Sequence, residues 1–182
     1  MKPMNDEFPQ ADVAAVHILR TCNYMTLATA HENRPWSATL FYAWDERARL
    51  VFMSALDSRH VSDCLANPLV AFSIYDSSQE PGTGNGVQGA GAVHRASESE
   101  LEVLLTTYYS RRFPSKSDLL PRLAGLVDRV ARLSRAFGKG LFVIEPTELY
   151  CLDLRSTDVD IRLRTDIGKV SQLLPRLWPR ER

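Results

Sequence analysis

Short apolar runs alternate with polar turns through the first third of the chain. The runs at 24–30, 36–45 and 49–55 are rich in aromatic and β-favouring residues, and the turns HENRP and DERAR separate them. Three such runs with short connections predict an antiparallel meander. A short apolar pattern over 12–20 predicts a helix in front of this meander.

A helix and two more strands are expected next. The segment SRHVSDCLAN (58–67) predicts a helix with Ser58 as its N-cap and Pro68 as its stop. The run at 68–76 predicts a fourth strand, and GVQGAGAVHRA (86–96) a fifth. The small residues of the fifth strand indicate that its backbone closely approaches either a ligand or another strand.

The second half of the chain carries helical signals before the sheet resumes. Ser97 and Glu100 have the spacing of a capping box, and an apolar face follows them, made by Leu101, Leu104, Leu105 and Tyr108. A second apolar stripe predicts a helix from about 117 to 137. The run at 141–154 predicts a sixth strand, residues from 156 onward can add a last one, and LPRLWPRER is expected to be loosely held.

Together these elements predict one α+β domain over residues 1–182. Its sheet is expected to form an antiparallel split β-barrel of about six strands, of Greek-key type, with flanking helices. A helical insertion is expected over about 97–138, and residues 156–182 are expected to form a C-terminal tail.

Composition narrows the function classes. The 182 residues are 45% hydrophobic, and 22 Lys and Arg balance 22 Asp and Glu. Zero net charge argues against duplex nucleic acid as a partner, and no apolar run reaches the ~20 residues of a membrane helix. The polar N-terminus lacks the apolar core of a signal peptide, so a cytoplasmic protein is expected. The three widely spaced cysteines indicate neither a disulfide framework nor a metal site.

The strongest chemical signal lies between the third strand and the helix that follows it. Ser54, Ser58, Arg59 and His60 place two hydroxyls, a guanidinium and an imidazole at a predicted helix N-terminus. Such a terminus offers unpaired N–H groups and partial positive charge, which suits a phosphate. The alternative is a simple helix cap.

A second candidate is the segment YYSRRFP (108–114). Eight basic residues but only two acidic ones fall between Arg111 and Lys139, a local excess in a neutral chain. Arg111 and Arg112 stand at a helix end between aromatics and a proline, where a guanidinium can be held in place to meet an anion. The alternative is a solvated helix face. No Ser-His-Asp order, HExxH motif or metal-binding spacing is present.

In order and spacing, these segments resemble the pyridoxamine 5′-phosphate oxidase-like, FMN-binding split-barrel family over roughly residues 12–155. The matching stretches are YMTLATA, WSATLFYAWD, LVFMSA, SALDSRHVSDCLANP, GVQGAGAVHRA and GLFVIEPTELYCLDL. The resemblance implies a homodimer with FMN in a groove between the subunits and a small-molecule substrate.

The resemblance also implies which residues would contact FMN. Ser58, Arg59 and His60 would meet the phosphate, while Met53 and Ser54 would lie beside the ribityl chain and the ring. Thr39, Leu40 and Phe41 would flank the isoalloxazine, and Gln88 lies near the position of a glutamine that is usual in the family.

Several departures from the family pattern leave the function open, among them the late aromatic that packs on the flavin, which is replaced near Cys151. His60 stands where many members have lysine, and the second strand has no cation near its start, so Arg111 and Arg112 are candidate replacements. The first hypothesis is a flavin-dependent oxidoreductase of unknown substrate. The alternatives are a non-catalytic protein that binds flavin, haem (through His60 or His94) or the deazaflavin F420, and an interaction protein without a cofactor. Whether the protein is an enzyme stays open.

Overall fold

The structure is a computed structural model, and it describes residues 10–80, 85–114, 137–152 and 161–176. The helix expected over 117–137 and the end of the C-terminal tail lie mostly or wholly outside these residues. Within them, no helix has both the length and the apolar character needed to cross a membrane.

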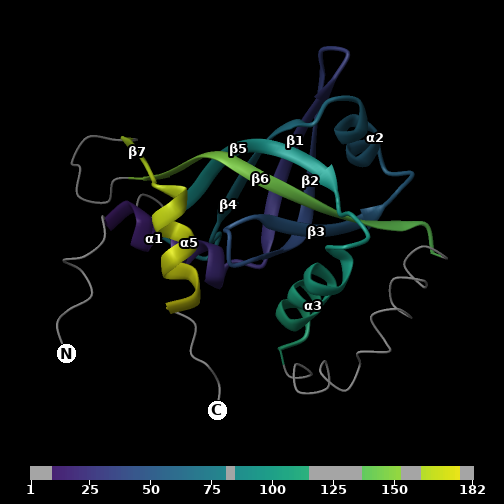
Figure 1. The fold of residues 1–182 in the computed structure, drawn as a ribbon. Helices are drawn as coiled ribbons and strands as arrows, with labels where there is room; N and C mark the ends of the chain where they lie inside the picture. Colours follow the sequence, from purple (N-terminus) through teal and green to yellow (C-terminus); the bar gives the residue numbers. More distant parts are fainter. Residues whose placement is uncertain (1–9, 81–84, 115–136, 153–160, 177–182) are drawn as a thin grey trace.

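Six antiparallel strands close into a barrel, and a seventh extends one edge (Figure 1). The strands are β1 (Tyr24–His31), β2 (Arg34–Trp44), β3 (Leu50–Ala55), β4 (Leu69–Tyr75), β5 (Gly86–Arg95), β6 (Lys139–Leu152) and β7 (Arg162–Arg164). The order is β3-β2-β1-β4-β5-β6, and pairing of β3 with β6 closes the ring. Because β4 returns to lie beside β1, the first four strands form a Greek key. The predicted α+β split barrel is confirmed.

Two local features shape the barrel. Glu32 and Asn33 have φ values of 50° and 60°, so the predicted turn between β1 and β2 is a tight two-residue hairpin. In β5, the pairing with β6 shifts between Ala90 and Gly91, and a Cβ added at Gly91 would collide with the Glu145 carbonyl. The close approach expected at the small residues of β5 is therefore to another strand.

The barrel interior is apolar, and one helix pair covers its side. Leu27, Tyr42, Phe52, Ile74 and Phe142 are almost fully buried in the main core. α1 (Gln10–Thr21) lies beside α5 (Ile167–Arg176) in Figure 1, and both contribute to this core.

α5 was not predicted from the sequence. Its buried residues Val170, Leu173 and Leu174 have helical spacing, but Gly168 and Pro175 obscure that pattern. The backbone N–H of Asp166 donates to Asp12 Oδ1 at 2.9 Å and fixes the start of α5 against α1.

α3 (Leu101–Arg112) packs on the outside of the barrel. Leu104, Leu105 and Tyr108 are buried against the outer faces of β2, β3 and β6, as their spacing predicted. The capping box forms only in part: Glu100 accepts from the Ser97 N–H at 3.2 Å, but the Ser97 hydroxyl donates to Glu100 at 2.7 Å and caps no backbone group. Arg49, which donates to Glu100 at 2.9 Å, ties the start of α3 to the turn between β2 and β3.

Candidate functional site

Ser54, Ser58 and His60 converge at one point, where β3 ends and α2 (Arg59–Ala66) begins. His60 Nε2 lies 2.6 Å from Ser54 Oγ and 3.3 Å from Ser58 Oγ, and the two hydroxyls are 3.4 Å apart. Ser58 occupies the N-cap position, but its hydroxyl donates to the Ala55 carbonyl at 2.8 Å. The prediction of Ser58 as the N-cap residue of α2 is confirmed, but its hydroxyl accepts no hydrogen bond from the first N–H groups of the helix.

His60 is 8% exposed, and burial lowers the pKa of its imidazole. The nearby Asp63 carboxylate opposes this effect, but desolvation is the larger influence. At neutral pH His60 is therefore uncharged and can either donate to or accept from the serines.

Arg59 supplies the permanent positive charge beside this cluster. Its guanidinium lies 4.4 Å from the ring centroid of Trp36, and its side chain is 48% exposed. Its Nε is 3.9 Å from Asp63, while Thr29 donates a hydrogen bond of 2.9 Å to the same buried carboxylate. A half-exposed ion pair of that length is weak, so the guanidinium can turn toward an anion.

The predicted ring contacts divide between the two faces of the barrel wall. Leu40 and Ser54 point inward, and Leu40 packs on the main core, so it can meet a ligand only through its backbone. Phe41 and Met53 point outward and pack with α3. Tyr109 donates a weak hydrogen bond to Met53 Sδ at 3.9 Å.

Arg112 joins this outer surface, as Phe41 and Tyr108 both lie next to its guanidinium. The guanidinium carbon is 5.3 Å from the centroid of Phe41, and Nη1 donates to the Tyr108 hydroxyl at 2.9 Å. Phe41 also contacts Tyr24 edge to face, with centroids 6.0 Å apart. A fixed cation from α3 thus lies against β2. The expectation that the second strand has no cation near its start is wrong, because β2 begins at Arg34.

Arg111 has a different role from the one expected of it. Its Nη2 donates to the carbonyls of Leu19 and Cys22 at 2.9 and 2.6 Å, and its other nitrogens reach Arg20 and Tyr42 carbonyls at 3.2 Å. The guanidinium therefore binds the C-terminal end of α1. The expectation that Arg111 contacts an anion is corrected, because its donors already serve backbone carbonyls.

Gln88 lies across the sheet from the outer face of β2. In the pairing of neighbouring strands, Thr39 of β2 lies opposite Thr26 of β1, Thr26 opposite Ser73 of β4, and Ser73 opposite Gln88 of β5. These four side chains form a polar row over β2, β1, β4 and β5. Gln88 is therefore separated from Thr39 by two strands, and one subunit does not bring it to the other predicted ring contacts.

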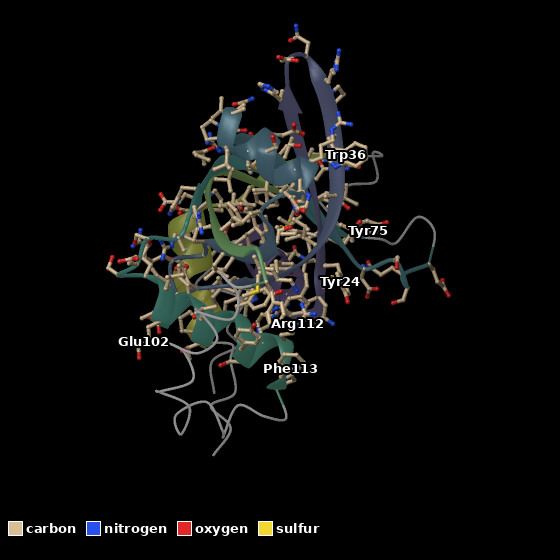
Figure 2. All side chains as sticks on the ribbon, turned by 90° about the vertical axis from the view of Figure 1, so that its right-hand side faces the viewer. Tyr24, Trp36, Tyr75, Glu102, Arg112 and Phe113 are labelled. Atoms are coloured by element: carbon tan, nitrogen blue, oxygen red, sulfur yellow. The ribbon has the colours of Figure 1, made fainter. Side chains whose placement is uncertain are left out.

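A pocket of about 410 Å³ opens at one end of this polar row. Thr26, Thr39 and Ser73 from the row line it, together with Tyr24, Tyr75 and Asp76. Figure 2 shows Tyr24 and Tyr75 on the same side of the molecule as Trp36 and Arg112. No motif in the sequence indicates this pocket, because its residues come from separate strands.

The three cysteines lie in the core. Cys22, Cys64 and Cys151 are buried and unpaired, and burial raises the thiol pKa of Cys64 to about 11 and of Cys151 to about 12. Within the described ranges, no three His, Cys, Asp or Glu side chains gather as metal ligands would.

Comparison with known proteins identifies the family. The family profile described as pyridoxamine 5′-phosphate oxidase matches residues 11–151. The chain belongs to the pyridoxamine 5′-phosphate oxidase family. Its closed six-stranded barrel is the FMN-binding split barrel expected from the sequence. A search of curated proteins finds no match to this chain.

Solved structures show the same fold at low sequence identity. A haem-binding protein from Mycobacterium smegmatis is 17% identical with a TM-score of 0.64, and the match covers 90% of this chain and 61% of that one. The haem storage protein HutZ from Vibrio cholerae is 15% identical with a TM-score of 0.54, covering 73% and 88%. An FAD-binding protein from Mesorhizobium loti is 17% identical with a TM-score of 0.50, covering 76% and 91%. This chain thus spans about six-tenths of the length of the haem-binding protein from Mycobacterium smegmatis.

Proposed function

We propose that this protein binds FMN, with the phosphate at the N-terminus of α2 and the ring on the outer face of β2 and β3. The observation that carries the proposal is the convergence of Ser54, Ser58 and His60 within 3.4 Å of one another, beside Arg59. Hydroxyl, imidazole and guanidinium donors at a helix N-terminus suit the several acceptor oxygens of a phosphate.

The outer face supports the ring position. Thr39, Phe41 and Met53 point outward there, and Arg112 adds a positive charge at its border. Apolar and aromatic side chains with one cation suit a flat ring that becomes more negative on reduction. When bound, a flavin supplies the redox chemistry, and the protein contributes binding, orientation and charge. We therefore infer a small flavin-dependent oxidoreductase acting on a small molecule.

A homodimer is the second part of the proposal. Register places Ala28, Ala71 and Ala90 in one row across β1, β4 and β5, beside the polar row. Leu69 lies on the same outer face of β4 and is 68% exposed. A flat surface of small residues with an exposed apolar side chain suits close packing against a second copy. Such packing can also bring the partner's Gln88 toward the flavin ring.

Titration with FMN tests the phosphate position. The change in flavin fluorescence is measured for the wild type, Arg59→Ala and the matched control Arg164→Ala, which removes an exposed arginine from β7. We expect saturable binding that Arg59→Ala weakens about tenfold, equivalent to ~1.4 kcal/mol, while Arg164→Ala leaves it unchanged. Failure of the wild type to bind FMN would overturn the proposal, and equal loss in both variants would show a general charge effect instead of a phosphate site.

A further inference from the structure

The pocket at the end of the polar row has the size of a ligand site. Its volume of about 410 Å³ falls within the ~300–1,000 Å³ typical of small-molecule sites. The lining comes from the end of α1 and from β1, β2 and β4, so several separate elements hold its shape. The predicted phosphate residues Ser54, Ser58, Arg59 and His60 are not part of it.

Two exposed tyrosines line this pocket. Tyr24 is 60% exposed and Tyr75 is 61% exposed, although both belong to strands whose neighbouring residues are buried. Tyr24 is held against Phe41 by an edge-to-face contact. Tyrosine rings held at the wall of a pocket offer apolar faces of negative potential, which favour flat and positively charged ligands.

Asp76 supplies the charge among the side chains that line the pocket. Its Oδ1 accepts hydrogen bonds from Ser78 N at 2.9 Å and from Ser78 Oγ at 2.6 Å, so its orientation is set by the chain just after β4. These hydrogen bonds lower the pKa of the carboxyl group, which stays ionised at neutral pH. Its other oxygen, Oδ2, makes no hydrogen bond that the described residues show.

Hydroxyl groups line the pocket beside the tyrosines. Thr26, Thr39 and Ser73 line the pocket with side chains that can accept a hydrogen bond from a ligand or donate one. Arg111, the nearby guanidinium, donates to the carbonyls of Leu19, Arg20, Cys22 and Tyr42 and is not among the residues that line the pocket. The pocket therefore combines aromatic walls, neutral hydroxyls and one carboxylate.

We propose that this pocket binds a planar aromatic cation whose N–H groups donate to Asp76 while its ring lies against Tyr24 and Tyr75. An amidinium, or a protonated amine on a heterocycle, has this chemistry. Thr39 lines the pocket and also belongs to the strand proposed to flank the flavin. The ligand would therefore be the substrate. That assignment rests on the proposed function, but the binding of the cation in this pocket does not depend on it.

The test uses benzamidine as the probe and benzamide as its uncharged counterpart. Binding to the full chain without flavin is measured by calorimetry for the wild type, Asp76→Asn, Tyr75→Ala and the control Val103→Ala. We expect benzamidine to bind at least threefold more tightly than benzamide, and Asp76→Asn to remove that preference. Tyr75→Ala should weaken the binding of both probes, while Val103→Ala, on the exposed face of α3 and outside the pocket, should change neither.

Equal affinities for the two probes, or an unchanged preference in Asp76→Asn, would overturn the proposal. A circular dichroism melt of each variant shows whether it is folded, and Asp76→Glu provides a second variant that keeps the charge and is expected to keep the preference. FMN titration of Asp76→Asn separates this inference from the proposed function. We expect normal FMN affinity in that variant, whereas Arg59→Ala should bind FMN about tenfold more weakly but bind benzamidine as the wild type does.

Discussion

The imidazole of His60 lies 2.6 Å from the hydroxyl of Ser54 although the two residues come from different elements. β3 carries Ser54 inward at its end, and the first turn of α2 brings His60 back over it. Because His60 is buried and its pKa is lowered, this pair is uncharged at neutral pH. A phosphate would change that balance, since a dianion beside an imidazole favours the protonated ring.

The first prediction follows from this linkage. FMN should bind more tightly as the pH falls from 8 to 6.5, because the complex takes up a proton at His60 that the free protein lacks. Over this pH range we expect the dissociation constant of the wild type for FMN to fall about threefold more than that of His60→Gln. Titrations at fixed ionic strength across this range measure the effect. A wild type and a His60→Gln variant with the same pH dependence would show that His60 takes up no proton on binding.

The second prediction concerns the stability of the flavin-free protein. The folded-state pKa of His60 is lower than its unfolded value, so the folded state binds fewer protons. The free energy of unfolding should therefore fall as the pH drops below about 6.5. Urea unfolding at pH 7.5 and 5.5 is the measurement, and His60→Gln should lose a smaller part of its stability over that interval. A larger loss in His60→Gln would contradict the assignment.

The third prediction distinguishes two adjacent arginines. Arg111→Met should lower the free energy of unfolding by about 2–4 kcal/mol, because it leaves the carbonyls at the end of α1 without their charged donor. Arg112→Met should cost less than about 1 kcal/mol, since that side chain is exposed and makes one hydrogen bond. Chemical denaturation of the two variants compares them. Similar losses would show that Arg111 has no special structural role.

The fourth prediction tests the proposed dimer surface. Ala71→Arg places a long charged side chain in the centre of the alanine row, and we expect it to convert a dimer into monomers. Thr106→Arg, on the exposed face of α3, is the control and should leave the mass unchanged. Light scattering coupled to size-exclusion chromatography measures both. A dimeric Ala71→Arg protein would place the interface elsewhere.

Much of the barrel could be predicted from the sequence because its signals are local. Alternating apolar residues, the Asn33 turn and the apolar face of α3 each depend on neighbours within a few positions. α5 escaped prediction since its glycine and proline obscure a helical pattern that packing against α1 stabilises.

Only the part of the site that depends on residues close together in the sequence could be predicted. Ser54, Ser58 and His60 are close in sequence, so their convergence followed from a strand-to-helix turn. The role of Arg111 depends on carbonyls about 70 to 90 residues away, and the pocket at Tyr24 and Tyr75 depends on strand order. Neither leaves a local pattern.

A comparison of FMN with riboflavin tests the central claim most directly. The two ligands share the ring and the ribityl chain and differ only in the phosphate, so the ratio of their dissociation constants isolates the α2 cluster. Our account predicts that the wild type binds FMN at least tenfold more tightly than riboflavin, and that Arg59→Ala shrinks this ratio. Equal affinity for the two ligands would show that Ser54, Ser58, Arg59 and His60 do not form a phosphate site.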